Sequence, residues 1–316
     1  MDLPMKHFPA GIVVTALFAT MLLFPKAVFN GASEGLLLWF QIIFPTLFPF
    51  LVVTSLLMST GGLRFVAGLF GKPLRHLLRV SHPGAFAVLA GFLCGYPMGA
   101  KVTADLLKKD LITRDEAEYL LSFCNNTSPI FIINFIVWKT FGQEELLFPT
   151  LGILILTPLL LSFLFRRFYL HGRRFFPEPD QETLSAKSSF RFSDLDACLM
   201  DSFEAIVKVG GYIIVFSVLL SLLNMLPISR QLFLLAAPSL EMTNGIMLLK
   251  ENLPAPLICY PAVIGLTSFG GFCSAAQTRC MLDGTGLKIL PYIIEKLAAA
   301  LAASLLAVLC LLFSGT

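Results

Sequence analysis

Glycine, proline and polar residues interrupt several long apolar stretches of this sequence. One interruption, GFLCGYPMG, covers residues 91–99, and another, CNNTSP, covers residues 124–129. Neither stretch can hold a regular helix throughout. An unpaired backbone group costs several kcal/mol in hydrocarbon, so such a break is tolerated only where protein or a water-filled cavity covers it. We therefore expect the breaks to face the protein interior, where helix ends offer free N–H groups to an anionic or carbonyl-bearing solute.

Polar side chains adjoin these two breaks. Lys101 follows the first break and would strengthen an anion site, although its side chain could instead extend to the cytoplasmic interface. Asn125, Asn126, Thr127 and Ser128 form the second break. They could bind a solute or cap the backbone groups that the following proline leaves free, and these two roles are compatible.

Further polar residues lie in the second half of the chain. Glu241, Thr243 and Asn244 stand between two apolar runs, and Ser268 and Gln277 flank the glycine-rich stretch SFGGFCSAAQ. An ionisable residue inside a membrane is costly and by default indicates function, so Glu241 is the strongest single candidate. The alternative is that Glu241 is a loop carboxylate at the membrane interface.

The composition indicates lipid as the solvent. Of the 316 residues, 56% are hydrophobic and only 14% are charged, against roughly 25% charged in soluble domains. A spanning helix needs about 20 apolar residues. Clear candidates are residues 8–24, which would be a retained first membrane helix, 35–59, 119–137, 146–165, 203–226 and 289–313; less regular apolar stretches are 84–100, 232–249 and 255–275. We predict an all-α fold, a polytopic transmembrane helical bundle.

Lysine and arginine are concentrated in two loops, residues 60–82 and 166–200. Cytoplasmic loops carry an excess of these residues, so both loops should be cytoplasmic. Three full crossings between them would place them on opposite sides. We therefore predict that residues 84–100 enter the membrane and return as a re-entrant hairpin, which makes the charged segment 101–118 and the N-terminus cytoplasmic as well.

The two halves of the chain have a similar order of segments. After an N-terminal membrane helix in residues 1–34, a first repeat covers residues 35–165, the basic linker covers 166–200, and a second repeat covers 201–316. A shift that places Gly95–Lys101 on Gly271–Gln277 aligns them. Because span 35–59 would run inward and span 203–226 outward, we predict two inverted repeats, each with a broken or re-entrant helix, and a binding site where the breaks meet.

The sequence contains no P-loop, no HExxH, no nucleophile elbow, no Rossmann glycine set and no CxxC pair among its seven cysteines. We therefore expect no enzymatic activity, no catalytic residues, no cofactor and no metal site. The basic residues lie in short loops and give no reason to expect nucleic acid as a partner. Gly91, Gly95 and Gly99 form overlapping small-xxx-small repeats, which allow close helix packing or a backbone-lined site.

Four motifs, GFLCGYPMGAK, CNNTSPIF, EMTNG and SFGGFCSAAQ, occur in this order. Together they resemble the YlbJ-type (SpoVV-like) sporulation integral membrane proteins, within the wider nucleoside recognition or Gate domain family. The resemblance covers residues 35–310 and implies a bacterial membrane protein with two Gate halves. The motif positions in this chain are Gly95, Tyr96, Pro97, Gly99, Lys101, Asn125, Asn126, Ser128, Pro129, Glu241, Thr243, Asn244, Gly245, Ser268, Gly270, Gly271 and Gln277.

The resemblance also implies a function, the passage of dipicolinic acid across the outer forespore membrane during sporulation. Helix-end N–H groups, Asn amides and Lys101 could receive its two carboxylates, while Tyr96 or Phe272 stacks on its ring. The expected partners are the lipid bilayer and this small solute, with a second copy of the chain or other spore-envelope membrane proteins as further partners.

Two other hypotheses remain open. The chain could be a non-transporting membrane scaffold for spore-envelope assembly, or a Gate-domain transporter of a nucleoside or another solute. A scaffold should tolerate polar changes at the breaks and be sensitive to changes in residues 166–200.

Overall fold

The computed structural model describes residues 8–60, 62, 65, 73–173, 176 and 192–314. These residues form helices and turns, with no β-strand among them, which confirms the predicted all-α class. Six helical stretches are long and apolar enough to cross a membrane: Pro25–Ser59, Arg114–Phe141, Glu144–Tyr169, Ser193–Leu223, Pro256–Met281 and Ile289–Phe313. The polytopic helical bundle predicted from composition is therefore the observed architecture.

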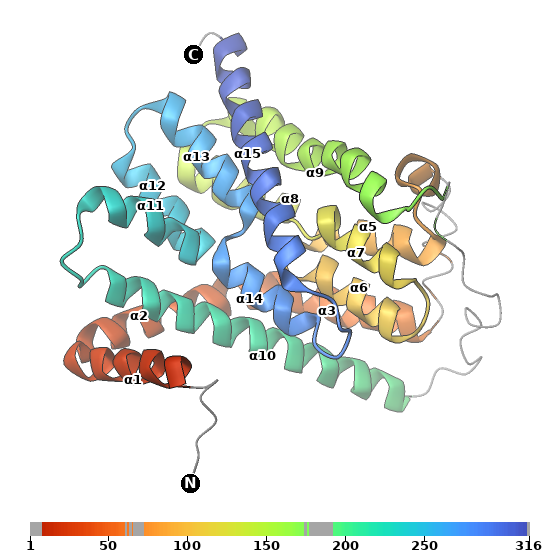
Figure 1. Cartoon of the computed structure of the whole chain (residues 1–316), viewed down its shortest axis with the longest axis horizontal. Coiled ribbons are helices and arrows are strands. Elements are labelled where there is room, and N and C mark those ends of the chain that lie inside the picture. Colours follow the sequence, from red (N-terminus) through yellow and green to blue (C-terminus); the bar gives the residue numbers. More distant parts are fainter. Residues whose placement is uncertain are drawn as a thin grey trace.

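Long helices form one edge of the molecule. They are α1 (Phe8–Leu23), α2 (Pro25–Leu38), the π-helical segment η2 (Trp39–Ile43), α3 (Phe44–Ser59) and α10 (Phe192–Leu223). Figure 1 shows α10 running along this edge, and α10 packs against both α2 and α3. A methyl group at Gly31 or at Gly35 would lie 2.8 Å from the backbone of α10. Glycine at these two positions therefore lets α2 approach α10 closely.

The first half of the chain contains a helical hairpin followed by an interrupted helix. The elements are α5 (His82–Cys94), α6 (Met98–Lys108), α7 (Arg114–Cys124), α8 (Pro129–Phe131), η3 (Ile132–Phe141), η4 (Glu144–Leu146) and α9 (Leu147–Tyr169). Residues 95–97 form the turn of the hairpin, and α5 packs against α6. Residues 125–128 have no helical structure, and they separate α7 from the continuous helix formed by α8 and η3.

The second half repeats this order. It contains α11 (Arg230–Leu240), α12 (Met242–Asn252), α13 (Pro256–Phe269), α14 (Gly271–Met281) and α15 (Ile289–Ser314). Glu241 alone separates α11 from α12, which pack against each other as a second hairpin. Gly270 alone separates α13 from α14. In Figure 1, α15 crosses the middle of the molecule between the two halves.

The hairpin helices are short. α5 has 13 residues, and α6, α11 and α12 have 11 each. At about 1.5 Å per residue, none reaches the ~30 Å thickness of a bilayer core. The turns of both hairpins can therefore lie at the depth where longer helices are still crossing.

Several boundaries differ from the predicted ones. The return arm of the predicted hairpin 84–100 is α6, which extends to Lys108. This longer helix is amphipathic: Lys101, Asp105 and Lys108 share one face, while Val102 and Leu106 are buried. The predicted linker 166–200 is shorter, since α9 ends at Tyr169 and α10 begins at Phe192. Residues 174–175 and 177–191 of this linker, and 61, 63–64 and 66–72 of the basic loop 60–82, lie outside the described residues.

Pro45 and Pro49 do not break the second predicted span. The helix continues from Pro25 to Ser59. In an α-helix a proline clashes with the carbonyl four residues earlier. For Pro45 that residue lies within η2, where the helix is wider than an α-helix. The Phe44 N–H bonds to the Trp39 carbonyl, one residue further back than in an α-helix. This wider turn accommodates the proline without ending the helix.

Glycines hold the first hairpin against the end of α7. An added methyl group at Gly91 would overlap the carbonyl oxygen of Cys124, and one at Gly99 would lie 2.5 Å from the same atom. Both hairpin helices therefore contact one backbone carbonyl at the C-terminal end of α7. The small-xxx-small pattern is used here for close helix packing.

We predict that Gly91→Ala destabilises the protein by about 1–3 kcal/mol, because the clash is with backbone that cannot rotate away. The thermal midpoint of the purified protein in detergent measures this. Gly152→Ala in α9 is the matched control, because an added methyl group there meets no atom within 4 Å. An equal midpoint for the two variants would contradict the packing described here.

Candidate functional site

The breaks of the two halves meet at the centre of the molecule. Tyr96, in the first hairpin turn, donates from its hydroxyl to the carbonyl oxygen of Ser268 in α13 at 2.9 Å. Thr127, in the break after α7, donates to the carbonyl oxygen of Thr267 at 3.0 Å. A methyl group at Gly271 would lie 3.0 Å from a carbonyl oxygen at the C-terminal end of α11. Residues far apart in the sequence therefore form one site.

Asn125 ties three helices to the break after α7. Its Oδ1 accepts from the backbone N–H of Ala100 in α6 at 3.3 Å, and its Nδ2 donates to the hydroxyl oxygens of Thr278 in α14 at 2.9 Å and Tyr292 in α15 at 3.0 Å. The side chain is fully buried. Asn125 therefore satisfies an otherwise free N–H in the first turn of α6. This is a cap on a different helix from the one that follows the break, so both predicted roles of the break remain predictions.

Lys296 of α15 is a buried cation that was not among the residues predicted from the sequence. Its side chain is 2% exposed. The Nζ atom donates to the carbonyl oxygen of Asn125 at 3.1 Å and to Oδ1 of Asn126 at 3.2 Å, and it lies 4.9 Å from the centre of the Tyr96 ring. Since α7 ends at Cys124, the ammonium lies where the last helix carbonyls lack partners and the helix carries partial negative charge. Its position inside the predicted membrane span 289–313 is the sequence feature that could have identified it as a functional candidate.

Lys101, the predicted cation of the site, has a different environment. It lies on α6 and pairs with Asp105 at 2.9 Å. It does not line the cavity beside the breaks that is described below. A cation does approach the breaks, but it comes from α15 in the other half of the chain.

Glu241 occupies the start of α12. Its two carboxylate oxygens accept from the backbone N–H groups of Thr243 at 3.0 Å and Asn244 at 2.8 Å, and the residue is 5% exposed. Glu241 is therefore a buried N-cap and not an exposed loop carboxylate. The chain thus places a carboxylate of its own at one of the central helix starts.

The start of α14 is different, because no side chain caps it. Gly270 and Gly271 have φ of +85° and +78°, a conformation that strongly favours glycine. A methyl group at Gly270 would lie 2.8 Å from the Tyr96 ring. By contrast, the start of α8 is capped by Ser128, whose hydroxyl accepts from the Phe131 N–H at 3.3 Å.

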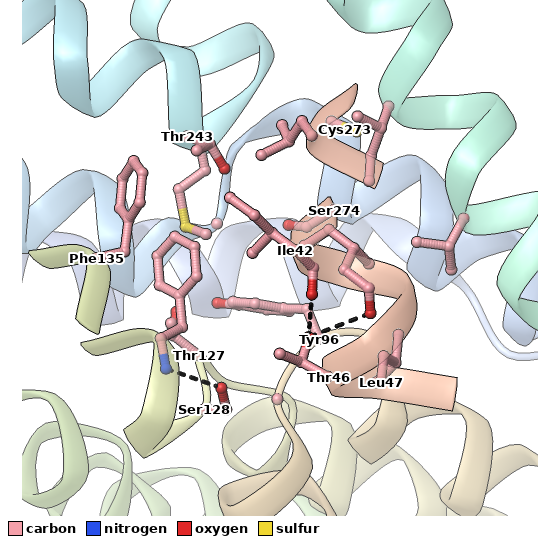
Figure 2. Close-up of a pocket in the computed structure, with 18 of the residues that line it drawn as sticks. Ile42, Thr46, Leu47, Tyr96, Thr127, Ser128, Phe135, Thr243, Cys273 and Ser274 are labelled. Atoms are coloured by element: carbon pink, nitrogen blue, oxygen red, sulfur yellow. Dashed lines mark hydrogen bonds between the residues drawn. The ribbon is translucent and has the colours of Figure 1, made fainter. Parts of the chain in front are cut away.

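A cavity of about 350 Å³ lies beside these breaks. Its size falls in the ~300–1,000 Å³ range of small-molecule sites. Figure 2 shows that hairpin and break residues face side chains of η2 and α3 across it. Its walls include the apolar side chains Ile42, Leu47, Phe131, Phe135, Ile213 and Met242. Gln277 is 6% exposed, and its Nε2 donates to Sγ of Cys273 at 3.3 Å, a weak acceptor.

The predicted site residues divide into two groups. Those that line the cavity are Gly95, Tyr96, Thr127, Ser128, Glu241, Thr243, Gly270 and Gln277. Those that do not line it are Pro97, Gly99, Lys101, Asn125, Asn126, Asn244, Ser268 and Gly271. The cavity also has lining residues that were not predicted, among them Gln41 and Thr46, which are polar residues within the predicted span 35–59. Among the described residues, no group of three or more His, Cys, Asp or Glu could hold a metal ion.

Comparison with known proteins gives one informative likeness. The chain is 28% identical over 330 residues to the sporulation integral membrane protein YlbJ of Bacillus subtilis, and the match covers 93% of this chain and 80% of that protein. No family model matches the chain. No solved structure matches it either. With the six apolar helices, this likeness supports an integral membrane protein similar along nearly its whole length to a sporulation protein.

We predict that Lys296→Met destabilises the protein by about 1–3 kcal/mol, because buried carbonyl oxygens at the end of α7 lose their donor. Thermal unfolding in detergent measures this. Lys101→Met is the matched control and should cost about 0–1 kcal/mol, since it breaks an ion pair in which both partners keep some contact with solvent. A larger loss for Lys101→Met would contradict the role given to Lys296.

Proposed function

We propose that this protein is a membrane transporter that moves a small anionic solute through the cavity between its helix breaks. The observation that carries this proposal is the meeting of four helix interruptions around one cavity, in a chain whose long helices have bilayer length. Non-helical backbone at membrane depth is expected only where it is enclosed by protein or lines a water-filled cavity. Transport sites are commonly built from such interrupted helices.

The order of elements supports two inverted repeats. Each half contains a hairpin, then a broken crossing helix, then a long helix, namely α9 or α15. If α5–α6 and α11–α12 are re-entrant, the first hairpin opens to the side of the basic loops, and the second, after α10 has crossed, opens to the other side. This pairs the turn at Gly95 with Glu241, and the break at Ser128 with Gly270. The pairing of Gly95 with Gly271 expected from sequence alone is not the one that the helices support.

The donors in the cavity favour an anion. The uncapped start of α14 offers backbone N–H groups and a partial positive charge. Gln277 can turn its amide from the Cys273 sulfur to a better acceptor. Lys139, an exposed residue of η3, contributes a positive charge to the lining. Glu241 provides an internal example, since its carboxylate already binds the start of another central helix, α12.

The apolar walls favour a solute with an aromatic body. Phe131, Phe135 and Tyr96 line the cavity and could contact a ring, while carboxylates reach the start of α14. Dipicolinic acid, a pyridine ring with two carboxylates, has this form. The likeness to a sporulation integral membrane protein also supports it. We therefore propose dipicolinate as the solute, moved across the forespore membrane during sporulation.

The test is flux into liposomes that contain the purified protein. We predict dipicolinate flux that Gln277→Leu reduces about tenfold, because a group that hydrogen-bonds a charged carboxylate contributes roughly 1.5 kcal/mol or more. Gln143→Leu, an exposed position in the loop before η4, is the matched control and should leave flux unchanged.

Competition in the same assay separates the alternatives. An excess of a nucleoside should not reduce dipicolinate flux, and a strong reduction would instead identify a nucleoside transporter. If no solute moves, and only changes in residues 166–200 impair sporulation, the protein is a scaffold and the transport proposal fails.

A further inference from the structure

The structure contains a second cavity, of about 280 Å³. It is formed by α7, α9 and α15, and its lining includes Arg114, Lys288, Tyr292 and Glu295. Tyr169 of α9 donates a short hydrogen bond to the Glu295 carboxylate. None of these residues belongs to the first cavity.

The two cavities share a polar wall. Tyr292 lines the second cavity, and its hydroxyl accepts from Asn125 at 3.0 Å. The Asn125 carbonyl oxygen accepts from Lys296 at 3.1 Å, and the Lys296 ammonium lies over the ring of Tyr96, which lines the first cavity. We call these four residues, Tyr96, Lys296, Asn125 and Tyr292, the barrier. Two hydrogen bonds and one cation–π contact join them, from Tyr292 of the second cavity to Tyr96 of the first.

The chemistry of the barrier is unusual for a structural core. Apolar side chains would close the same space without the cost of removing an amine, an amide and two hydroxyls from water. Buried polar networks of this kind depend on every member keeping its partner. The Lys296 ammonium can exchange its acceptors, because the carboxylate of a passing solute can replace the Asn125 and Asn126 oxygens.

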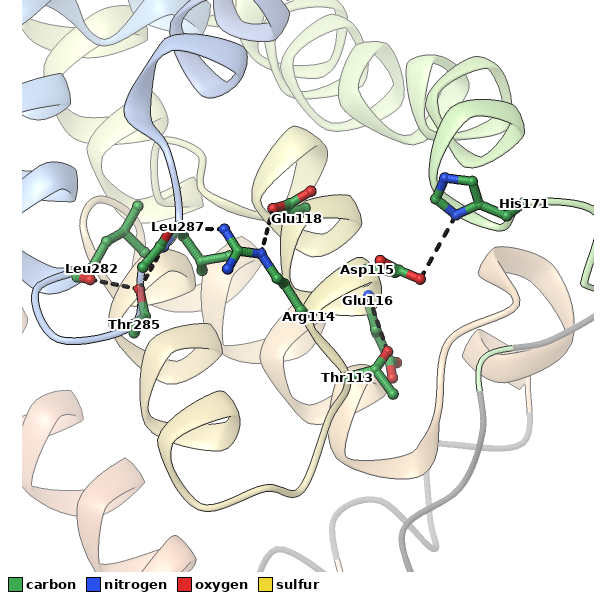
Figure 3. A network of polar contacts seen from close by, with 10 residues as sticks. Thr113, Arg114, Asp115, Glu116, Glu118, His171, Leu282, Thr285 and Leu287 are labelled. Atoms are coloured by element: carbon green, nitrogen blue, oxygen red, sulfur yellow. Dashed lines mark hydrogen bonds and ion pairs between the residues drawn. The ribbon is translucent and has the colours of Figure 1, made fainter.

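The second cavity lies on the side of the basic residues. Near it, Arg173 and His171 at the end of α9 face Asp115 at 3.6 Å and 3.7 Å. Figure 3 shows His171 and Asp115 beside the start of α7, with Arg114 on the other face of that helix. Cytoplasmic ends of membrane helices carry an excess of lysine and arginine. We therefore expect this side to be cytoplasmic. Lys288, which has no ion pair within the described residues, gives the cavity a cation that attracts anions.

Arg114 holds the loop beside the second cavity through two contacts, which we call the latch. Arg114 donates to the backbone carbonyl oxygen of Gly286 at 2.8 Å and pairs with Glu118 at 3.1 Å. It thereby holds the loop 282–288, which leads directly into α15 (Figure 3). Gly284 and Gly286 in this loop have positive φ. These two glycines allow a tight turn directly before the helix that carries Lys296 and Tyr292.

We propose that the second cavity is the cytoplasmic entrance to the same path, for the same class of small anion, and that the barrier opens when α15 moves with the loop that Arg114 holds. This inference rests on the proposed transport function. Lys296 is then the residue that receives the anion between the two cavities, and Arg114 acts as a positioning residue that favours the closed state.

The first test is sided labelling of a functional cysteine-less protein in oriented vesicles with a membrane-impermeant thiol reagent. Lys288→Cys should react from the cytoplasmic side, and Lys139→Cys in the first cavity should react from the opposite side. Reaction of both positions from the same side would overturn the second entrance, while flux through the protein would still support the proposed function. If the two cysteines react from opposite sides but dipicolinate does not move, the result would support the two entrances and overturn the proposal that dipicolinate is the solute.

The second test uses the chain with its own cysteines. Arg114→Gln should raise dipicolinate flux about fivefold, as expected when one hydrogen bond of about 1 kcal/mol no longer holds the closed state. Arg173→Gln removes an exposed cation on the same side and should leave flux unchanged. An unchanged or lower flux in Arg114→Gln, with the protein still folded by its thermal midpoint, would overturn the latch and the barrier opening that depends on it.

Discussion

The ammonium group of Lys296 at the end of α7 is the interaction on which the centre of this protein depends. Helix α7 stops inside the molecule, where its last carbonyls have neither helical partners nor bulk water. Lys296 supplies the missing donor from a different helix, α15, and from the other half of the chain. The Tyr96 ring covers the same ammonium, and the Tyr96 hydroxyl reaches α13. A single cation thus connects both halves, the first hairpin turn and the break after α7.

The breaks themselves could be predicted from the sequence, because proline, glycine and asparagine act on the backbone locally. The stretches around Gly95, Asn125, Glu241 and Gly270 were all expected to be irregular, and each is a helix end. Partners could not be predicted in this way. Lys101 is next to a break in the sequence, yet in space the nearby cation is Lys296, which is 2% exposed. Which lysine reaches a break depends on how α15 packs, and one helix's sequence does not contain that information.

The predicted repeat shows the same limit at a larger scale. The order of segments predicts two similar halves, and the shift that aligns them pairs Gly95 with Gly271. In the structure Gly95 forms a hairpin turn, whereas Gly271 begins the second part of a crossing helix. Glycine serves both situations, since each needs close backbone approach or positive φ. Helix lengths are the better guide, because two helices of 11 residues around Glu241 match the short arms around Gly95.

The short hairpin helices have a consequence for the electric field. If water fills the spaces that these helices leave open on each side, the membrane voltage does not fall evenly over the full ~30 Å of hydrocarbon. It falls mainly across the few side chains between the two cavities. A charge that moves only past Tyr96 and Lys296 would then cross most of the potential, which is worth about 2.3 kcal/mol per elementary charge for each 100 mV. For a doubly charged anion this energy would be twice as large, and it would be concentrated at the step past Tyr96 and Lys296.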